Sequence, residues 1–139
     1  MVGGLIAVAI LLVVAVPDGK RHPVAWRDLT GKVGPVLTSD LTRRLFRTRR
    51  QFQEFFGTDR ESPVDFSTRQ LLLVAPGPRS STGYAVQVLS VTENDDGIMV
   101  KVREKTPALT DHVEAGVTYP YRLLSLPAGK AVYVDWVGR

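Results

Sequence analysis

Side chains that commonly do chemistry are scarce in this sequence. The chain has two histidines, His22 and His112, and no cysteine, which excludes thiol nucleophiles, thiolate metal sites and disulfides. Neither histidine has the spacing of a metal-binding motif such as H-E-x-x-H, and no phosphate-binding glycine loop is present. Asp111 beside His112 could form a base with its orienting carboxylate, but an exposed pair in a polar loop is the commoner arrangement. We therefore predict a protein that is not an enzyme, with no small-molecule substrate, no metal and no cofactor.

Two tyrosine-containing segments are the better candidates for a functional site. They are Ser81-Thr82-Gly83-Tyr84 and Thr118-Tyr119-Pro120-Tyr121. Tyrosines at junctions between loops and strands offer amphipathic contact area at low entropic cost, which suits binding to another protein. The alternative for Tyr84 is a core position with a hydrogen-bonded hydroxyl, and the sequence does not separate the two. The residues predicted to bind a protein partner are Ser81, Thr82, Gly83, Tyr84, Tyr119, Pro120 and Tyr121.

The arginines between positions 43 and 50 form the densest charge cluster. They could bind phosphates or an acidic partner, or they could be the solvated face of a strand and a helix start. We favour the solvated face because no aromatic or glycine-rich RNA-binding motif accompanies them. The net charge of +4 is also modest, so nucleic acid is not expected as a partner. The members of the cluster are Arg43, Arg44, Arg47, Arg49 and Arg50.

A β-hairpin over residues 81–104 is the clearest structural element, and it positions the first tyrosine segment. Asn94-Asp95-Asp96-Gly97 has the composition of a tight turn, since Asx side chains bond their own backbone and glycine takes positive φ. Apolar residues alternate with polar ones on both sides of this turn. Such alternation is typical of two antiparallel strands that are each buried on one face. The alternating residues are Tyr84, Val86 and Val88, and Ile98, Val100 and Val102.

Other segments complete a mainly β domain. A capping box at Thr48 and Gln51 predicts one short helix, which carries three phenylalanines on one face and ends at Gly57. The apolar run 70–75 predicts a strand buried on both faces, and 76–81 is expected to be a loop. Further strands are predicted over 117–126, as an edge-tolerant strand with a proline near its beginning, and over 131–136. Short strands separated by turns, with one short α-helix, indicate an antiparallel β-sandwich-like domain over residues 36–139.

The amino-terminal part divides into an apolar segment and a connection. Residues 3–16 form an apolar run of about 14 residues, only about 21 Å long as a helix, whereas a bilayer core needs about 30 Å. We predict that residues 1–16 are a signal peptide or membrane anchor, with a buried strand as the alternative. Residues 17–35 are rich in turn-forming and charged residues and are predicted to be a linker. The only membrane contact of the chain would then be through residues 3–16.

The order of these motifs resembles the carboxy-terminal domain of the PrcB family of protease-complex subunits. The resemblance extends over roughly residues 36–136 and includes both tyrosine segments, Ser81-Thr82-Gly83-Tyr84 and Thr118-Tyr119-Pro120-Tyr121. The shorter elements in between are Asp65-Phe66-Ser67, Leu71-Leu72-Leu73-Val74, Gly77, Ala85-Val86, Gly97-Ile98-Met99-Val100 and Leu126-Pro127.

This resemblance implies a non-catalytic, extracytoplasmic bacterial domain that associates with a surface protease and supports its stability or assembly. Two departures from the family pattern stand out. Ser81 and Thr82 replace the first two residues of the usual T-G-G-Y turn. Founding members are anchored through a lipidated cysteine, which this chain lacks, so residues 3–16 would have to provide secretion or retention.

A weaker resemblance gives an alternative function. Thr82-Gly83-Tyr84 is similar to the T-T-G-Y loop of chagasin-like inhibitors of cysteine proteases, which are immunoglobulin-like β domains. Their other two loop signatures, G-x-G-G and R-P-W, are absent from this sequence. Inhibition of a protease is therefore the second hypothesis, after an accessory subunit that stabilises one.

Overall fold

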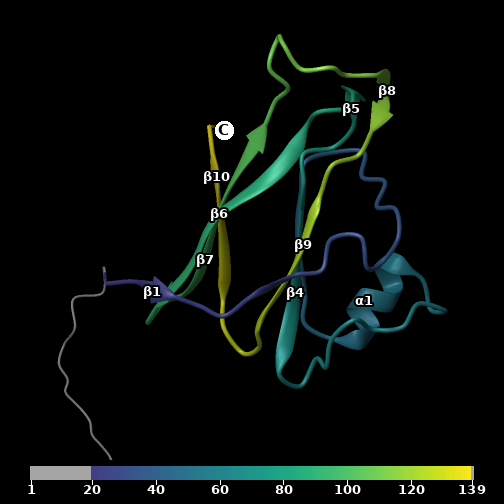
Figure 1. The fold of residues 1–139 in the computed structure, drawn as a ribbon. Helices are drawn as coiled ribbons and strands as arrows, with labels where there is room; N and C mark the ends of the chain where they lie inside the picture. The colour runs from purple at the N-terminus through teal and green to yellow at the C-terminus, as the bar shows by residue number, and fades with distance from the viewer. Residues whose placement is uncertain (1–19, 139) are drawn as a thin grey trace, which may run out of the picture.

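The computed structural model describes residues 20–138, in which strands predominate and one short helix is present (Figure 1). The mainly β fold predicted from the sequence is confirmed. The predicted signal peptide or anchor lies outside the described residues. In chain order the elements are β1 (His22–Pro23), β2 (Arg27–Asp28), β3 (Thr42–Phe46), α1 (Arg49–Phe56), β4 (Arg69–Ala75), β5 (Arg79–Ser81), β6 (Ala85–Asn94), β7 (Gly97–Lys105), β8 (Ala115–Thr118), β9 (Arg122–Pro127) and β10 (Val132–Val137).

The strands form two larger sheets and a small ribbon. Sheet A has the order β1-β6-β7-β10, sheet B has the order β2-β9-β4-β3, and β5 pairs with β8. In Figure 1 sheet B lies between sheet A and α1, with the β5–β8 ribbon at the top. All pairs are antiparallel except β7 and β10, which run parallel. The fold is thus a sandwich with a helix on the outer face of one sheet.

The hydrophobic core lies on both faces of sheet B. Between the two sheets pack Val86, Ile98, Val100, Leu72 and Leu124, among others. The opposite face of sheet B packs against α1 and the segment that follows β2. The residues buried there are Val33, Val36, Phe46, Phe52, Leu71, Leu73 and Leu123. Burial on both faces explains why β4 is a nearly continuous apolar run, as predicted.

Helix α1 begins and ends where the sequence predicts. The amide of Gln51 donates a hydrogen bond to the Thr48 hydroxyl (3.1 Å), and the Gln51 side chain accepts one from the amide of Arg47 (2.7 Å). Gly57 closes the helix with its N–H bonded to the carbonyl of Gln53. Phe52 is fully buried and stacks on Phe56, with ring centres 4.7 Å apart. The aromatic face therefore attaches the helix to sheet B.

The predicted hairpin is present as β6 and β7, with one irregularity. The register shifts between Val88 and Ser90, so Leu89 is the extra residue of a bulge. Gly97 adopts φ of 140° in the turn, and a Cβ there would lie 2.6 Å from the carbonyl oxygen of Ala131. The same carbonyl accepts a hydrogen bond from the amide of Ile98 (2.8 Å). Glycine is thus needed where β10 enters sheet A.

Three segments differ from the sequence-based expectation. The predicted linker, residues 17–35, contributes β1, β2 and the buried Val24 and Val33 from residue 20 onward. The predicted loop 76–81 contains β5, because Arg79 and Ser81 pair with β8. The predicted strand 117–126 is interrupted around Pro120, so its first part belongs to β8 and its second part, β9, lies inside sheet B between β2 and β4. In each case the strand exists because a distant segment supplies its hydrogen-bonding partner.

Candidate functional site

The fold brings the two predicted tyrosine segments together. Tyr84, directly before β6, and Tyr119, Pro120 and Tyr121, between β8 and β9, line one shallow hollow of about 270 Å³. We call it the tyrosine hollow. The remaining residues that line it are Thr30, Ala85, Val86 and Arg122. Residues 35 positions apart in the sequence meet there because β5 and β8 form a ribbon that brings the ends of both segments together.

Tyr121 has a structural role in this hollow. Its hydroxyl accepts a hydrogen bond from the amide of Gly31 (2.9 Å) and donates one to the carbonyl of Gly34 (3.1 Å). These bonds fix the segment after β2 against the start of β9. Tyr84 and Tyr119 are half-buried, so part of each ring is accessible. Tyr121 is half-buried as well, so all three rings contribute accessible surface to the hollow, and the hydroxyl of Tyr121 also holds its wall.

An arginine and a glutamate fix the position of Tyr84. The guanidinium carbon of Arg79 lies 5.8 Å from the centre of the Tyr84 ring, a cation–π distance. The same guanidinium donates hydrogen bonds of 2.6 and 2.7 Å to the two carboxylate oxygens of Glu104. The hydrogen bonds to Glu104 raise the pKa of Arg79 above its usual value. The charge over the tyrosine ring is therefore permanent at any physiological pH.

The turn before Tyr84 is exposed and attached to a neighbouring segment. The amide of Thr82 donates to the carbonyl of Glu114 (3.0 Å), and the Thr82 hydroxyl accepts from the amide of Glu114 (2.9 Å). The Ser81 carbonyl accepts a hydrogen bond from the Thr118 hydroxyl (2.8 Å). Gly83 has φ of 98°, and a Cβ there would lie 2.9 Å from Cβ of Pro107. Ser81, Thr82 and Gly83 thus form a preorganised turn beside the hollow and do not line it.

The hollow has the chemistry of a contact surface. It contains aromatic rings, a proline and backbone groups, with Arg122 held by the Val86 carbonyl (2.7 Å) and by Asp28 (3.3 Å). His22 and His112 are both exposed and lie outside the lining of the hollow. Within residues 20–138 no three His, Asp or Glu side chains are close enough together to hold a metal ion. Such a surface can bind a protein through aromatic contact area and backbone hydrogen bonds.

The arginine cluster of β3 and α1 is exposed to solvent. Arg43 and Arg44 lie on β3, and the guanidinium of Arg44 is 5.2 Å from the ring centre of Phe55. Arg50 pairs with Glu54 one helical turn later, at 3.8 Å. This arrangement agrees with the solvated face expected from the sequence.

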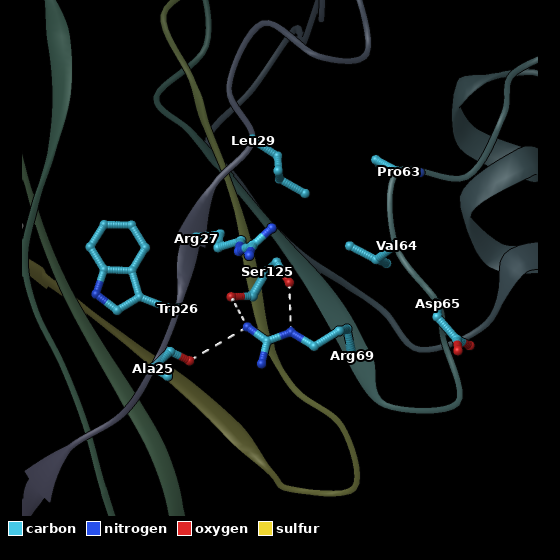
Figure 2. Close-up of a pocket in the computed structure, with 9 residues that line it drawn as sticks. All are labelled: Ala25, Trp26, Arg27, Leu29, Pro63, Val64, Asp65, Arg69 and Ser125. Carbon is cyan, nitrogen blue, oxygen red and sulfur yellow. Dashed lines mark hydrogen bonds between the residues drawn. The ribbon is translucent and has the colours of Figure 1, made fainter.

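A second hollow was not predicted from the sequence. It has a volume of about 420 Å³ and lies where β2, the loop at Pro63 and Val64, and the start of β4 meet (Figure 2). Arg27 and Arg69 both line it, as does the buried Ser125 of β9. We call it the arginine hollow. No local signal could have indicated it, since Arg27 lies in a segment with linker composition and Arg69 lies 42 positions further on.

The fold is a β-sandwich domain, and the tyrosine hollow is a partly exposed aromatic surface on it. Among the described residues, 20–138, no helix is both long and apolar enough to cross a bilayer. No curated protein and no solved structure matches the chain. The family model of the PrcB C-terminal domain matches residues 71–127. This match confirms the predicted resemblance for the segment from β4 to the end of β9, which includes both tyrosine segments.

Proposed function

We propose that this chain is a non-catalytic accessory domain that binds a partner protease and stabilises it, with the tyrosine hollow as the contact surface. The observation that carries the proposal is the coincidence of two findings. The segment that matches the PrcB C-terminal domain contains both tyrosine segments, and the fold places Tyr84 beside Tyr119 and Pro120 in one hollow.

The shape and rigidity of the surface support protein binding. Tyr84 is held by the cation of Arg79, and the wall of the hollow is held by the two hydrogen bonds of Tyr121. A surface that is already ordered loses little conformational entropy on binding. Its shallow form suits a protein surface better than a small substrate, which usually occupies a deeper pocket.

The proposal includes the location of the protein. A stabilising subunit of a surface protease acts outside the cytoplasm, and residues 3–16 would provide export or anchoring. This part is checked independently by adding a protease to cells whose outer layers have been removed and following digestion of the chain by immunodetection.

The inhibitor hypothesis remains the alternative. Thr82 and Gly83 are exposed at a turn, as an inhibitory loop requires. However, the two hydrogen bonds between Thr82 and Glu114 hold this turn against the neighbouring segment. An accessory subunit and an inhibitor both bind a protease, so only the activity of the bound protease separates them.

The test is a pull-down from envelope extract with the full chain as bait, followed by assay of each captured protease with and without bait. An accessory subunit leaves the protease active and lengthens its half-life at the growth temperature. A captured protease that is inactive contradicts the proposal and supports inhibition. Failure to capture any protease at bait concentrations above those in the cell also contradicts it.

A further inference from the structure

The arginine hollow lies on the α1-facing side of sheet B, beyond the part that α1 covers. Along β4 this face carries Leu73, Leu71 and then Arg69, and along β9 it carries Leu123 and then Ser125, because alternate residues share a face. The first residues of each series are buried in the core under α1. At Arg69 and Ser125 the face changes from apolar to polar, and the hollow begins there.

Two cations line this hollow. Arg27 of β2 is opposite Ser125 in the sheet register, and its guanidinium forms no hydrogen bond or ion pair with another residue in the stretch 20–138. Arg69 donates to the hydroxyl and the carbonyl of Ser125, both at 2.8 Å, and to the carbonyl of Ala25 at 3.5 Å. All of its acceptors are uncharged. The positive charge of the hollow is therefore not neutralised by those contacts.

One acidic side chain lines the hollow, and it is hydrogen-bonded within its own turn. Asp65 lines the hollow, but its carboxylate accepts hydrogen bonds from the amide and hydroxyl of Ser67, at 3.0 and 2.7 Å. In Figure 2 the carboxylate of Asp65 lies away from the guanidinium groups of Arg27 and Arg69. Two like charges in one cavity repel each other, and a bound anion relieves this repulsion.

The other groups of the hollow indicate what kind of anion fits. Ser125 is buried, and its hydroxyl already accepts from Arg69, so its own proton is available to donate. Leu29, Val64 and Pro63 supply an apolar wall above the guanidinium groups (Figure 2). Arginine binds a carboxylate with two parallel hydrogen bonds. A volume of about 420 Å³ leaves room for an apolar group attached to that carboxylate.

We propose that the arginine hollow binds a carboxylate carried on an apolar body, in the form of the carboxyl-terminal residue of a peptide chain. Arg27 pairs with the carboxylate, Arg69 and Ser125 complete its hydrogen bonds, and the terminal side chain packs on Leu29 and Val64. The site is separate from the tyrosine hollow and does not depend on the function proposed for that hollow.

Titration of the full chain by nuclear magnetic resonance tests this assignment. The side-chain Nε–H signals of Arg27 and Arg69 are followed with four probes. Acetyl-Ala-Leu has both the terminal carboxylate and the apolar body. The carboxamide of acetyl-Ala-Leu has only the apolar body, and acetate has only the carboxylate. Acetyl-Glu-Leu-amide carries its carboxylate on a side chain instead of at the end of the chain. We expect saturable shifts with acetyl-Ala-Leu, and affinities for the carboxamide and for acetate that are about 10- to 100-fold weaker.

Two exposed arginines provide the matched variants. Arg27→Gln is expected to weaken the binding of acetyl-Ala-Leu about 10- to 100-fold. Arg43→Gln on β3 is expected to leave this affinity unchanged. Unchanged backbone signals outside the hollow show that each variant is folded. Equal affinity for the acid and the carboxamide, equal affinity for acetate, or no effect of Arg27→Gln would overturn the proposal. Equal binding of acetyl-Glu-Leu-amide would also overturn it, because the carboxylate would then not need to be the end of a peptide chain.

Discussion

Arg79 on β5 forms a two-bond ion pair with Glu104 on β7, with nitrogen–oxygen distances of 2.6 and 2.7 Å. The pair joins the β5–β8 ribbon to sheet A, and the same guanidinium lies over the ring of Tyr84. One side chain thus supports both the fold and the proposed contact surface.

Removal of this ion pair is expected to destabilise the domain. The side chains of Arg79 and Glu104 are only 21% and 11% exposed, so Arg79→Met removes a two-bond ion pair that is largely shielded from water. We expect the free energy of unfolding to fall by about 1.5–3 kcal/mol, measured by urea denaturation. Arg50→Met is the control, because Arg50 and Glu54 are 88% and 64% exposed and such pairs contribute less than about 0.5 kcal/mol. Equal losses of unfolding free energy in the two variants would contradict a special contribution of the Arg79–Glu104 pair.

Gly83 is expected to tolerate no side chain. Gly83→Ala forces an L-residue into positive φ and places Cβ against Pro107 and Val113. Gly129→Ala is the matched control, because Gly129 also has positive φ (81°) but no atom within 4 Å of the added Cβ. The control is expected to cost about 1–2 kcal/mol, and Gly83→Ala about 1–3 kcal/mol more. Equal unfolding midpoints for the two variants would show that the turn can move.

Tyr121→Phe is expected to lower stability through the loss of two hydrogen bonds. The hydroxyl bonds the backbone of Gly31 and Gly34, so its removal is expected to cost about 1–2 kcal/mol. Tyr133→Phe on the outer side of sheet A is the control, because that ring is 51% exposed and the change is expected to stay within about 0.5 kcal/mol. If Tyr121→Phe left the free energy of unfolding unchanged, the hydroxyl would not hold the wall of the hollow.

The hydrogen bonds in the turn at Asp65 predict that the stability of the domain depends on pH. Hydrogen bonds from the hydroxyl and the amide of Ser67 lower the pKa of Asp65 below its usual 3.8. The folded-state pKa is depressed, so the contribution to stability is present above the unfolded-state pKa, about 3.9, and is lost as pH falls through the folded-state pKa. Ser67→Ala should raise the pKa of Asp65, whereas Ser67→Thr keeps the hydroxyl and the low value. The carboxyl chemical shift of Asp65, measured as a function of pH, gives its pKa in each variant. An unchanged pKa in Ser67→Ala would contradict the role of the Ser67 hydroxyl.

Much of the fold could be predicted because its signals are local. The turn at Asn94 to Gly97 and the alternation around it specify the β6–β7 hairpin within one short stretch of chain. The Thr48 hydroxyl and the Gln51 side chain likewise specify the start of α1. Tyrosines at junctions between loops and strands located both candidate segments, and the family match over residues 71–127 contains them.

The parts that could not be predicted depend on distant pairing. Arg79 follows two prolines and a glycine, so it resembles a loop residue, and only its pairing with Thr118 makes it part of a strand. The parallel pairing of β10 with β7 has no local signature. Arg27 and Arg69 meet only because β2 and β4 lie on either side of β9.

The most direct test of the proposed contact surface uses the absence of cysteine from the sequence. Tyr119→Cys and Tyr133→Cys each create a chain with a single thiol, to which a photo-activated cross-linker is attached. The first thiol lies in the tyrosine hollow and the second on the outer side of sheet A. We predict that, in envelope extract, a protease becomes cross-linked to position 119 and not to position 133, and that it still cleaves its substrate. Equal cross-linking at both positions, or cross-linking at position 133 alone, would contradict the account.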